Sequence, residues 1–262
     1  MPELIEVEYY RLDLDALIGC RIEAISIDDE RCVRPKGLPR AAFQVLVGEP
    51  LHRTWRRGKL LLAEFGAGGE GETLAIRFGM TGRLLVDGVS RIPHLEYASK
   101  KNDPKWDRFE MQLGGHLVSL RDQRCLGSVE LNPDLSSLAP EASTIDAEEL
   151  RLALRGRTKA LKAILLDQAL IAGLGNLLAD EVLWQSGIAP SRPADELAHD
   201  EIEALAATIR ETVEQLTGAG GSNCGESFAL RSPGTRCSRC DGSMRRDAVG
   251  GRTSWWCSTH QS

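Results

Sequence analysis

The stretch that decides the fold of the C-terminal half is LLDQALIAGLGNLLADEVLWQSGIAP, residues 165–190. Apolar residues at helical spacing lie on both sides of a short break that contains Gly173 and Gly175, which permit a tight backbone turn. Asn176 then begins the second helix, where free backbone amides suit a phosphate group. The pattern predicts two helices joined by a turn that contacts a nucleic-acid backbone. A simple helical corner without a ligand is the alternative interpretation of this stretch.

Basic residues gather on both sides of this predicted helix pair. The run RLALRGRTKALK (151–162) contains Lys162 and four other basic residues but no acidic residue. From Arg231 to the C-terminus six Arg residues face two Asp residues, although the whole chain has a net charge of -6. This distribution fits a face that is reserved for a polyanion. Ordinary solvated faces would give the same runs, so both interpretations stay open on charge alone.

The end of the chain is a cysteine-rich module, in which CSRC (237–240) and CSTH (257–260) are sixteen residues apart. Two close pairs separated by a turn-forming stretch are typical of a closed, tetrahedral zinc site. Such a site has no open position for water, so its role is structural, and so small a module depends on its metal to fold. We predict one structural Zn²⁺, held by Cys237, Cys240, Cys257 and His260.

The N-terminal half has a different pattern. Residues 3–18 have apolar side chains at near-helical spacing and predict an amphipathic helix. Short apolar or alternating runs follow, separated by Gly and Pro, and predict an all-β sandwich or barrel. These runs are RIEAISI, KLLLAEF, TLAIRFGM, RLLVDG, RFEMQL, HLVSLRD and SVEL.

The chain therefore divides into segments that differ in composition and in hydrophobic periodicity. We expect an N-terminal domain over residues 1–132 and a Pro- and Ser-rich linker over 133–145. A helical domain (146–222) and the zinc finger (223–262) would follow. Within the helical domain, helices are expected at 147–155, 159–168, 175–186 and 198–217.

Composition also indicates the compartment. No run approaches the roughly 18 apolar residues that a membrane span needs, and the acidic N-terminus lacks the apolar segment of a secretory signal. The seven cysteines are an odd number, and three lie close to the C-terminus, which is more typical of a metal site than of a disulfide framework. We expect a cytoplasmic protein, associated with the nucleoid if its source is bacterial.

The chain begins with MPELIEVE, so a proline follows the initiator. Met1 is normally removed before a small residue, and Pro2 would then carry a free secondary amine beside Glu3. An α-amine has a pKa of about 8 and a lysine about 10.4, so roughly a tenth of the α-amine is unprotonated at pH 7. Pro2 is thus a candidate nucleophile. A frayed chain end without a function is the simpler interpretation of this stretch taken by itself.

Several stretches, in this order, resemble the formamidopyrimidine-DNA glycosylase and endonuclease VIII family of base-excision repair enzymes. MPELIEVE is similar to the start of the formamidopyrimidine branch, with Ile5 in place of a proline. The helix pair matches the helix-two-turn-helix signature, with Leu178 where tyrosine is usual and Trp184 where phenylalanine is usual. The remaining matches are RRGKLLL (56–62), FGMTG (78–82) and GRTSWWC (251–257).

The resemblance implies an α+β multidomain protein: an N-terminal helix plus β-sandwich, a helix-two-turn-helix domain and a C-terminal β-hairpin zinc finger. It implies a bifunctional DNA glycosylase and AP lyase, acting as a monomer on damaged double-stranded DNA, that flips an oxidised base out of the duplex. The implied catalytic residues are Pro2 as nucleophile, Glu3 as general acid and base, Glu6 as a second carboxylate and Lys59 as a stabiliser of charge. The implied DNA contacts are Met80 in the void left by the flipped base, Arg124 at the orphan base, Leu126, Lys162, Asn176 and Arg252.

Three features depart from the family pattern. In DQRCLG (122–127), Leu126 replaces an aromatic wedge. The segment 221–237 is shorter than is usual in the formamidopyrimidine branch, and the missing part resembles the loop that covers flipped 8-oxoguanine. His260 replaces a cysteine as the fourth zinc ligand, which changes the charge of the site but not its geometry. The first two departures leave the preferred lesion open.

Two other functions compete with this interpretation. A non-catalytic, zinc-containing DNA-binding protein of the same fold would keep the DNA contacts, but it would not need Pro2, Glu3 and Lys59, which this chain retains. A zinc-dependent nuclease would need an open metal site, which four ligands in a closed module do not provide.

Overall fold

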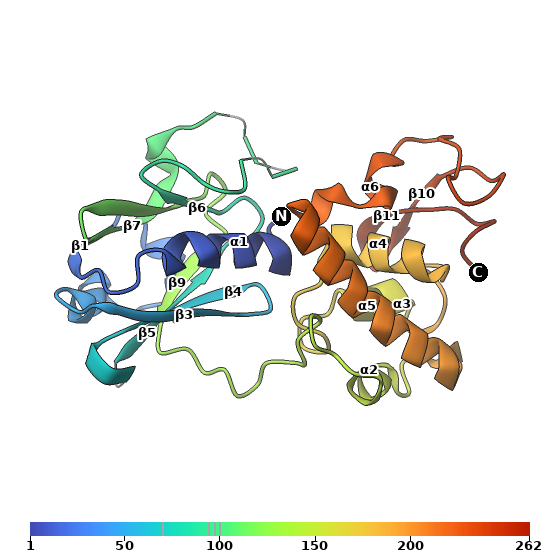
Figure 1. Cartoon of the computed structure of the whole chain (residues 1–262), viewed down its shortest axis with the longest axis horizontal. Coiled ribbons are helices and arrows are strands. Elements are labelled where there is room, and N and C mark those ends of the chain that lie inside the picture. Colours follow the sequence, from blue (N-terminus) through green and yellow to red (C-terminus); the bar gives the residue numbers. More distant parts are fainter. Residues whose placement is uncertain (70, 94, 97, 100) are drawn as a thin grey trace. The chain divides into compact units, whose positions relative to one another are not determined.

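The computed structural model describes residues 1–69, 71–93, 95–96, 98–99 and 101–262. Its contacts divide the chain into two compact units, Met1–Ser136 and Ser137–Ser262 (Figure 1). The second unit contains both the helical segment and the cysteine-rich module, which the sequence separates into two domains. The finer limits of the four expected segments stay a prediction.

In its described residues, the first unit is a sandwich of two sheets with one α-helix, α1 (Leu4–Asp15). Its strands are β1 (Ile22–Ile27), β2 (Val33–Arg34), β3 (Leu51–Arg57), β4 (Leu60–Phe65), β5 (Glu72–Arg77), β6 (Arg83–Val86), β7 (Asp107–Leu113), β8 (His116–Arg121) and β9 (Ser128–Leu131). One sheet has the order β1-β7-β8-β6 and the other has the order β2-β9-β5-β4-β3. Apolar side chains from both sheets form one core. Short 3₁₀ segments connect the strands: η1 (Glu30–Cys32), η2 (Arg40–Leu46), η3 (Ala67–Gly69) and η4 (Pro104–Trp106).

Helix α1 packs on β3 and β4 of one sheet and on β6 of the other. Since β3 and β6 are edge strands, the helix covers the side of the sandwich where these two edges meet (Figure 1). Its face toward the sheets consists of fully buried side chains, among them Val7, Tyr10 and Leu14. This packing fixes the start of the helix against the β3–β4 hairpin, whose turn is formed by Gly58 and Lys59.

The expected fold class is confirmed, and all seven runs expected to be strands form them, as β1 and β4 to β9. The sequence did not predict β2 or β3. Strand β3 is an edge strand with the sequence LHRTWRR, and its burial does not alternate cleanly. Periodicity therefore carries little signal there, because the pattern depends on one face being buried and the other solvated.

The second unit is built around helix α4 (Asn176–Ser186), whose residues 177–184 are all buried. The other helices are α2 (Ala147–Leu154), α3 (Leu161–Leu165), α5 (His199–Ala219) and α6 (Glu226–Ala229), with 3₁₀ segments η5 (Ala194–Glu196) and η6 (Ser222–Cys224). A hairpin of β10 (Arg245–Val249) and β11 (Arg252–Trp256) completes the unit. Helix α4 contacts α3, α5, α6 and β11.

The four helices expected here are found, but α3 is shorter than the predicted span 159–168. Lys159 lies in a bend before the helix, and Ala160 pairs with Pro193. Among the helices of the described residues, none is long and apolar enough to cross a membrane.

Candidate functional site

The start of helix α1 holds two buried carboxylates. Glu3 is the N-cap residue and forms a reciprocal capping box with Glu6, in which the Glu3 N–H donates to Oε2 of Glu6 at 2.8 Å. A capping box satisfies two of the N–H groups that a helix start leaves free. Glu3 and Glu6 have exposed fractions of only 1% and 4%, and Pro2, which precedes them, is also buried. The helix cap therefore fixes both acids next to Pro2.

The terminal amine lies in the same environment. Burial lowers the pKa of the Met1 α-amine below its ordinary value, while the charges of Glu3 and Glu6 raise it and that of Lys59 lowers it. These interactions mean that Lys59, in the β3–β4 turn, acts on the same group as the two acids. The structure thus brings Glu3, Glu6 and Lys59 together around the start of the chain.

A second group of expected residues meets where two loops of the sandwich touch. Nη1 of Arg124 donates to Sδ of Met80 at 3.4 Å. Leu126 packs on the backbone of Gly79, where an added Cβ would lie 2.8 Å from the Leu126 Cβ. Arg124 is exposed, and Leu126 has an exposed fraction of 48%, high for a leucine. Met80, Arg124 and Leu126 therefore form one cluster that is open to solvent.

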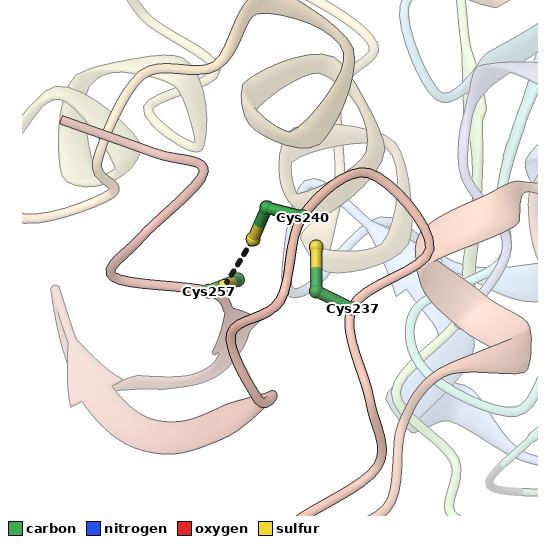
Figure 2. Close-up of side chains that lie close together, drawn as sticks. All are labelled: Cys237, Cys240 and Cys257. Carbon is green, nitrogen blue, oxygen red and sulfur yellow. Dashed lines mark hydrogen bonds between the residues drawn. The ribbon is translucent and has the colours of Figure 1, made fainter.

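Three cysteines of the second unit converge on one point (Figure 2). The Sγ atoms of Cys237, Cys240 and Cys257 all lie within 4.8 Å of one another, and those of Cys240 and Cys257 are 3.6 Å apart. The backbone N–H of Arg239 donates to Sγ of Cys237 at 3.4 Å, and that of Gly242 donates to Sγ of Cys240 at 3.3 Å. The thiolate is the form of cysteine that binds metals. The cluster could hold a metal ion.

His260 lies beside this cluster without joining it. Its Nε2 is 2.9 Å from the carbonyl oxygen of Trp184, and the two rings meet edge to face with centroids 4.8 Å apart. Sequence spacing predicts His260 as the fourth ligand, but the structure groups only the three cysteines. Coordination by His260 stays a prediction.

The β10–β11 hairpin ends in the two-residue turn Gly250-Gly251, in which both residues have positive φ, 59° and 73°. Glycine tolerates this conformation, which suits the twist of a tight hairpin. An added Cβ at Gly250 would lie 2.8 Å from the Cβ of Ala163, so the turn packs closely on α3. Arg252, the first residue of β11, is exposed beside this anchored turn.

Lys162 corrects a sequence-based expectation, because it does not face solvent. Its side chain has an exposed fraction of 0%, and its Nζ forms an ion pair of 2.6 Å with Oδ1 of Asp180. Nζ also donates to the carbonyl oxygen of Thr253 and to Oγ of Ser254, both at 2.8 Å. A fully buried ammonium group cannot contact a DNA phosphate, so the expected direct contact is wrong. Lys162 instead joins α3 to α4 and β11.

Asp180 is the centre of this buried network, a role that the sequence did not suggest. Its Oδ2 pairs with Nη2 of Arg231 at 2.6 Å and lies 3.4 Å from the N–H of Trp255. Burial raises the pKa of Asp180, and the charges of Lys162 and Arg231 oppose that shift. One carboxylate thus connects α3, α4, β11 and the segment before the cysteines.

Asn176 begins α4, with Gly175 as the N-cap, as the sequence predicts. Among the described residues, Oδ1 of Asn176 is buried and has no hydrogen-bond partner. Its expected DNA contact is not tested by this arrangement.

Trp184 connects α4 to the cysteine-rich module. It is fully buried and packs with Cys237, Met244 and Cys257 in one apolar cluster. Its Nε1 donates to Oε2 of Glu226 at 3.1 Å. A tryptophan in place of the family's phenylalanine was the only sequence signal for this contact.

Two family models match the chain: the formamidopyrimidine-DNA glycosylase N-terminal domain over residues 1–129 and the formamidopyrimidine-DNA glycosylase H2TH domain over residues 137–226. A formamidopyrimidine-DNA glycosylase of Cereibacter sphaeroides is 37% identical over 238 residues, covering 85% of this chain and 81% of the relative. One of Ruegeria pomeroyi is 33% identical over 290 residues, covering 100% of both chains.

Solved structures of Lactococcus lactis Fpg have the same fold. The complex with abasic-site DNA matches with a TM-score of 0.82 and 27% identity, covering 100% of both chains. A mutant bound to Fapy-dG-containing DNA matches with a TM-score of 0.83 and the same 27% identity and 100% coverage of both chains. Identity above a third across most of the chain, matches to both domains and a shared fold lead to one conclusion. The chain belongs to the formamidopyrimidine-DNA glycosylase family.

Proposed function

We propose that this chain is a bifunctional DNA glycosylase and AP lyase that removes oxidised bases from duplex DNA. The observation that carries the proposal is the start of α1, where Glu3 and Glu6 are buried beside the buried Pro2. Together with Lys59, these acids act on the amine of Met1, the residue whose removal would expose the Pro2 nitrogen. Burial disfavours the protonated form of an amine, and the unprotonated form is the nucleophile. The DNA-bound relatives support the same activity.

The first chemical step would replace one bond at C1′ of the flipped nucleotide by another. After removal of Met1, the Pro2 nitrogen attacks C1′ while the bond from C1′ to the base breaks. The proton that the Pro2 nitrogen loses neutralises the departing base. Glu3 then places a proton on the ring oxygen as the sugar opens, which gives an iminium between Pro2 and C1′. Because proline is a secondary amine, this iminium is permanently cationic and withdraws electrons.

The second step would break the DNA strand. The iminium acidifies C2′, a base removes its proton, and the electron pair expels the phosphate oxygen from C3′. Water then hydrolyses the iminium and releases Pro2. Lys59 would stabilise negative charge on phosphate or on the leaving base, while the capping box with Glu6 keeps Glu3 in place.

The exposed cluster of Met80, Arg124 and Leu126 would fill the space that the flipped nucleotide leaves and contact the orphan base. Asn176 and Arg252 would contact the DNA backbone and the minor-groove side, respectively. Lys162 would act only indirectly, by fixing the hairpin that carries Arg252.

We assign a single structural Zn²⁺ to the three cysteines, with His260 as the fourth ligand. The thiol cluster, its N–H donors and the C-x-x-H spacing support this assignment. Nε2 of His260 faces the Trp184 carbonyl, which would leave Nδ1 free for the metal. Histidines that bind metals commonly donate their other ring N–H to a carbonyl or carboxylate.

Borohydride trapping tests the nucleophile, because reduction of the iminium cross-links the protein to abasic DNA. The processed wild type should cross-link, and Pro2→Gly, a primary amine, should cross-link less. A variant with an N-terminal tag that blocks Pro2 should not cross-link.

Binding to a duplex that contains a tetrahydrofuran abasic analogue serves as the control, because the tagged variant should still bind it. Equal trapping by the tagged variant would show that Pro2 is not the nucleophile. Binding by the wild type without any trapping or cleavage would favour the non-catalytic DNA-binding protein.

A further inference from the structure

Asp122 follows β8 directly, and its side chain is fully buried, with an exposed fraction of 0%. Its Oδ2 accepts hydrogen bonds from the backbone N–H groups of Leu126 at 2.6 Å and Gly127 at 2.7 Å. Its Oδ1 accepts one from the N–H of Arg124 at 3.1 Å and one from the Thr81 hydroxyl. One carboxylate therefore joins the loop that contains Thr81 to the loop that follows β8.

The backbones of these two loops are closely packed. An added Cβ at Gly79 would lie 2.6 Å from the carbonyl carbon of Leu126, and one at Gly127 would lie 2.8 Å from the carbonyl oxygen of Arg77. Gly79 also has a positive φ of 57°, which disfavours any other residue. A small change in either backbone would therefore move the side chains that the loops carry.

The loop after β8 also holds a residue in an uncommon conformation. Cys125 has a φ of 52°, in the left-handed region that residues other than glycine rarely adopt. Such a conformation persists where the surroundings determine it. The Asp122 carboxylate binds the N–H groups on both sides of Cys125, those of Arg124 and Leu126, and so favours this shape.

We propose that Asp122 is a positioning residue that sets opposite-base discrimination. It fixes Met80, next to Thr81, and the pair Arg124 and Leu126 in one arrangement. The inference rests on the proposed function, in which this cluster contacts the orphan base. Interactions that determine recognition must be held within roughly 0.5 Å, so loosening the carboxylate bonds should blur discrimination without removing the nucleophile.

The test compares Asp122→Asn with the wild type in two assays on the full, metal-loaded chain. Binding is measured to duplexes in which a tetrahydrofuran abasic analogue lies opposite each of the four bases. Borohydride trapping is measured on a single-stranded abasic oligonucleotide, which has no orphan base. We expect Asp122→Asn to weaken binding to the preferred duplex by roughly 10- to 100-fold. It should also reduce the spread, that is, the range of DNA affinities measured with the four opposite bases. Trapping on the single strand should stay within about twofold of the wild type.

Two further variants separate positioning from loss of structure. Thr81→Val keeps the carboxylate and removes one donor, so it should reduce the spread less than Asp122→Asn does. Glu64→Gln is a matched control, since Glu64 is a buried acid of β4, 5% exposed, that pairs with Arg53 away from both loops. It should leave the spread unchanged even if it lowers the melting temperature.

The proposal is overturned if Asp122→Asn keeps the wild-type spread. It is also overturned if the wild type shows no spread, or if Glu64→Gln reduces the spread equally. A wild type that binds with a clear spread but never traps would contradict the proposed chemistry. The binding arm would still decide the role of Asp122.

Discussion

Each unit contains a buried aspartate close to residues that we propose contact DNA. The carboxylates of these two aspartates find their hydrogen-bond and ionic partners in different ways. Asp122 of the first unit accepts from three backbone N–H groups and a hydroxyl. Asp180 of the second unit lies between two cations, with Lys162 Nζ and Arg231 Nη2 each 2.6 Å away. Asp122 mainly shapes the turn that follows it and joins that turn to one neighbouring loop through Thr81, whereas Asp180 connects three other segments by ionic contacts and hydrogen bonds.

The difference indicates which interactions hold the functional residues of each unit in place. The first unit has an extensive apolar core in which α1 and both sheets participate. Among the described residues, the cluster at the cysteine-rich module consists of Cys237, Met244 and Cys257 packed with Trp184 of α4. We infer that chemistry in the first unit is positioned by hydrogen bonds on a stable core. We propose that the β10–β11 hairpin of the second unit depends instead on the ionic contacts of Asp180 and on a metal held by the cysteine cluster.

Metal removal should give the largest difference between the units. Structural zinc contributes on the order of 10 kcal/mol to the folding of small zinc modules. We expect Cys237→Ser to lose the metal, to lose hydrogen-exchange protection in β10 and β11, and to bind DNA weakly. Protection in the β-sandwich should remain. Native mass spectrometry and hydrogen exchange measure both effects.

Cys224→Ser is the matched control for this experiment, because Cys224 is an exposed, free cysteine outside the cluster. It should retain one zinc ion and normal protection. Loss of the metal from Cys237→Ser with unchanged DNA binding would break the proposed connection between the module and DNA.

Asp180→Asn should be the next largest effect. Removing one partner of a buried ion pair leaves an uncompensated charge and costs about 3–5 kcal/mol. Asp122→Asn should cost less, about 1–3 kcal/mol, because it leaves unsatisfied N–H groups instead of a buried cation. Denaturant unfolding, with hydrogen exchange to assign the affected unit, compares the two variants.

A double variant sharpens this comparison. Lys162→Met in the Asp180→Asn background removes the stranded ammonium, so part of the lost stability should return. If Asp122→Asn proves as costly as Asp180→Asn, or if Lys162→Met gives no recovery, the distinction between the two aspartates is wrong.

The sequence predicted those parts of the site that depend on local pattern. Glu3 and Glu6 stand at capping-box spacing at the start of the predicted helix. Lys59 came only from the resemblance of RRGKLLL to the family, because the strand that precedes its turn, β3, was not predicted. Lys162 could not be placed from the chain alone, because its burial depends on Asp180 and on Ser254, 92 residues away. The basic run around it looks the same whether its members face solvent or the core.

Arg252→Ala should have a smaller effect that leaves the unit intact. Arg252 is exposed at the hairpin turn and takes no part in the thiol cluster. We expect DNA affinity to fall about tenfold, or about 1.4 kcal/mol, with zinc retained and unfolding unchanged. Arg245→Ala is the control, because Arg245 is exposed at the other end of the hairpin, opposite Trp256. Equal losses in both variants would indicate a diffuse charge effect.

The segment after α5 (221–237) is the part of the second unit in which a loop over the flipped base is expected. Its N–H groups at Glu226 and Ser227 donate to the carboxylate of Glu181 at 3.2 and 2.8 Å. Glu226 also pairs with Arg239 at 2.7 Å. An added Cβ at Gly225 would lie 2.3 Å from Oε2 of Glu181, so the segment packs tightly on α4. Because residues 225–227 are packed on α4 by these contacts, they are not free to close over a flipped base.

Lesion preference should therefore show the smallest effect. We predict that no loop covers the flipped base and that Leu126 is the wedge, so that selection depends on how easily a lesion leaves the base stack. Flipping costs a few kcal/mol, and poorly stacked lesions lower that cost. We expect hydantoins, formamidopyrimidines and some oxidised pyrimidines to be excised ahead of 8-oxoguanine, by roughly tenfold for each 1.4 kcal/mol of difference. Single-turnover excision from otherwise identical duplexes measures this order. If 8-oxoguanine opposite cytosine is removed as fast as guanidinohydantoin, another segment must hold the flipped purine, and selection in this chain does not depend on unstacking alone.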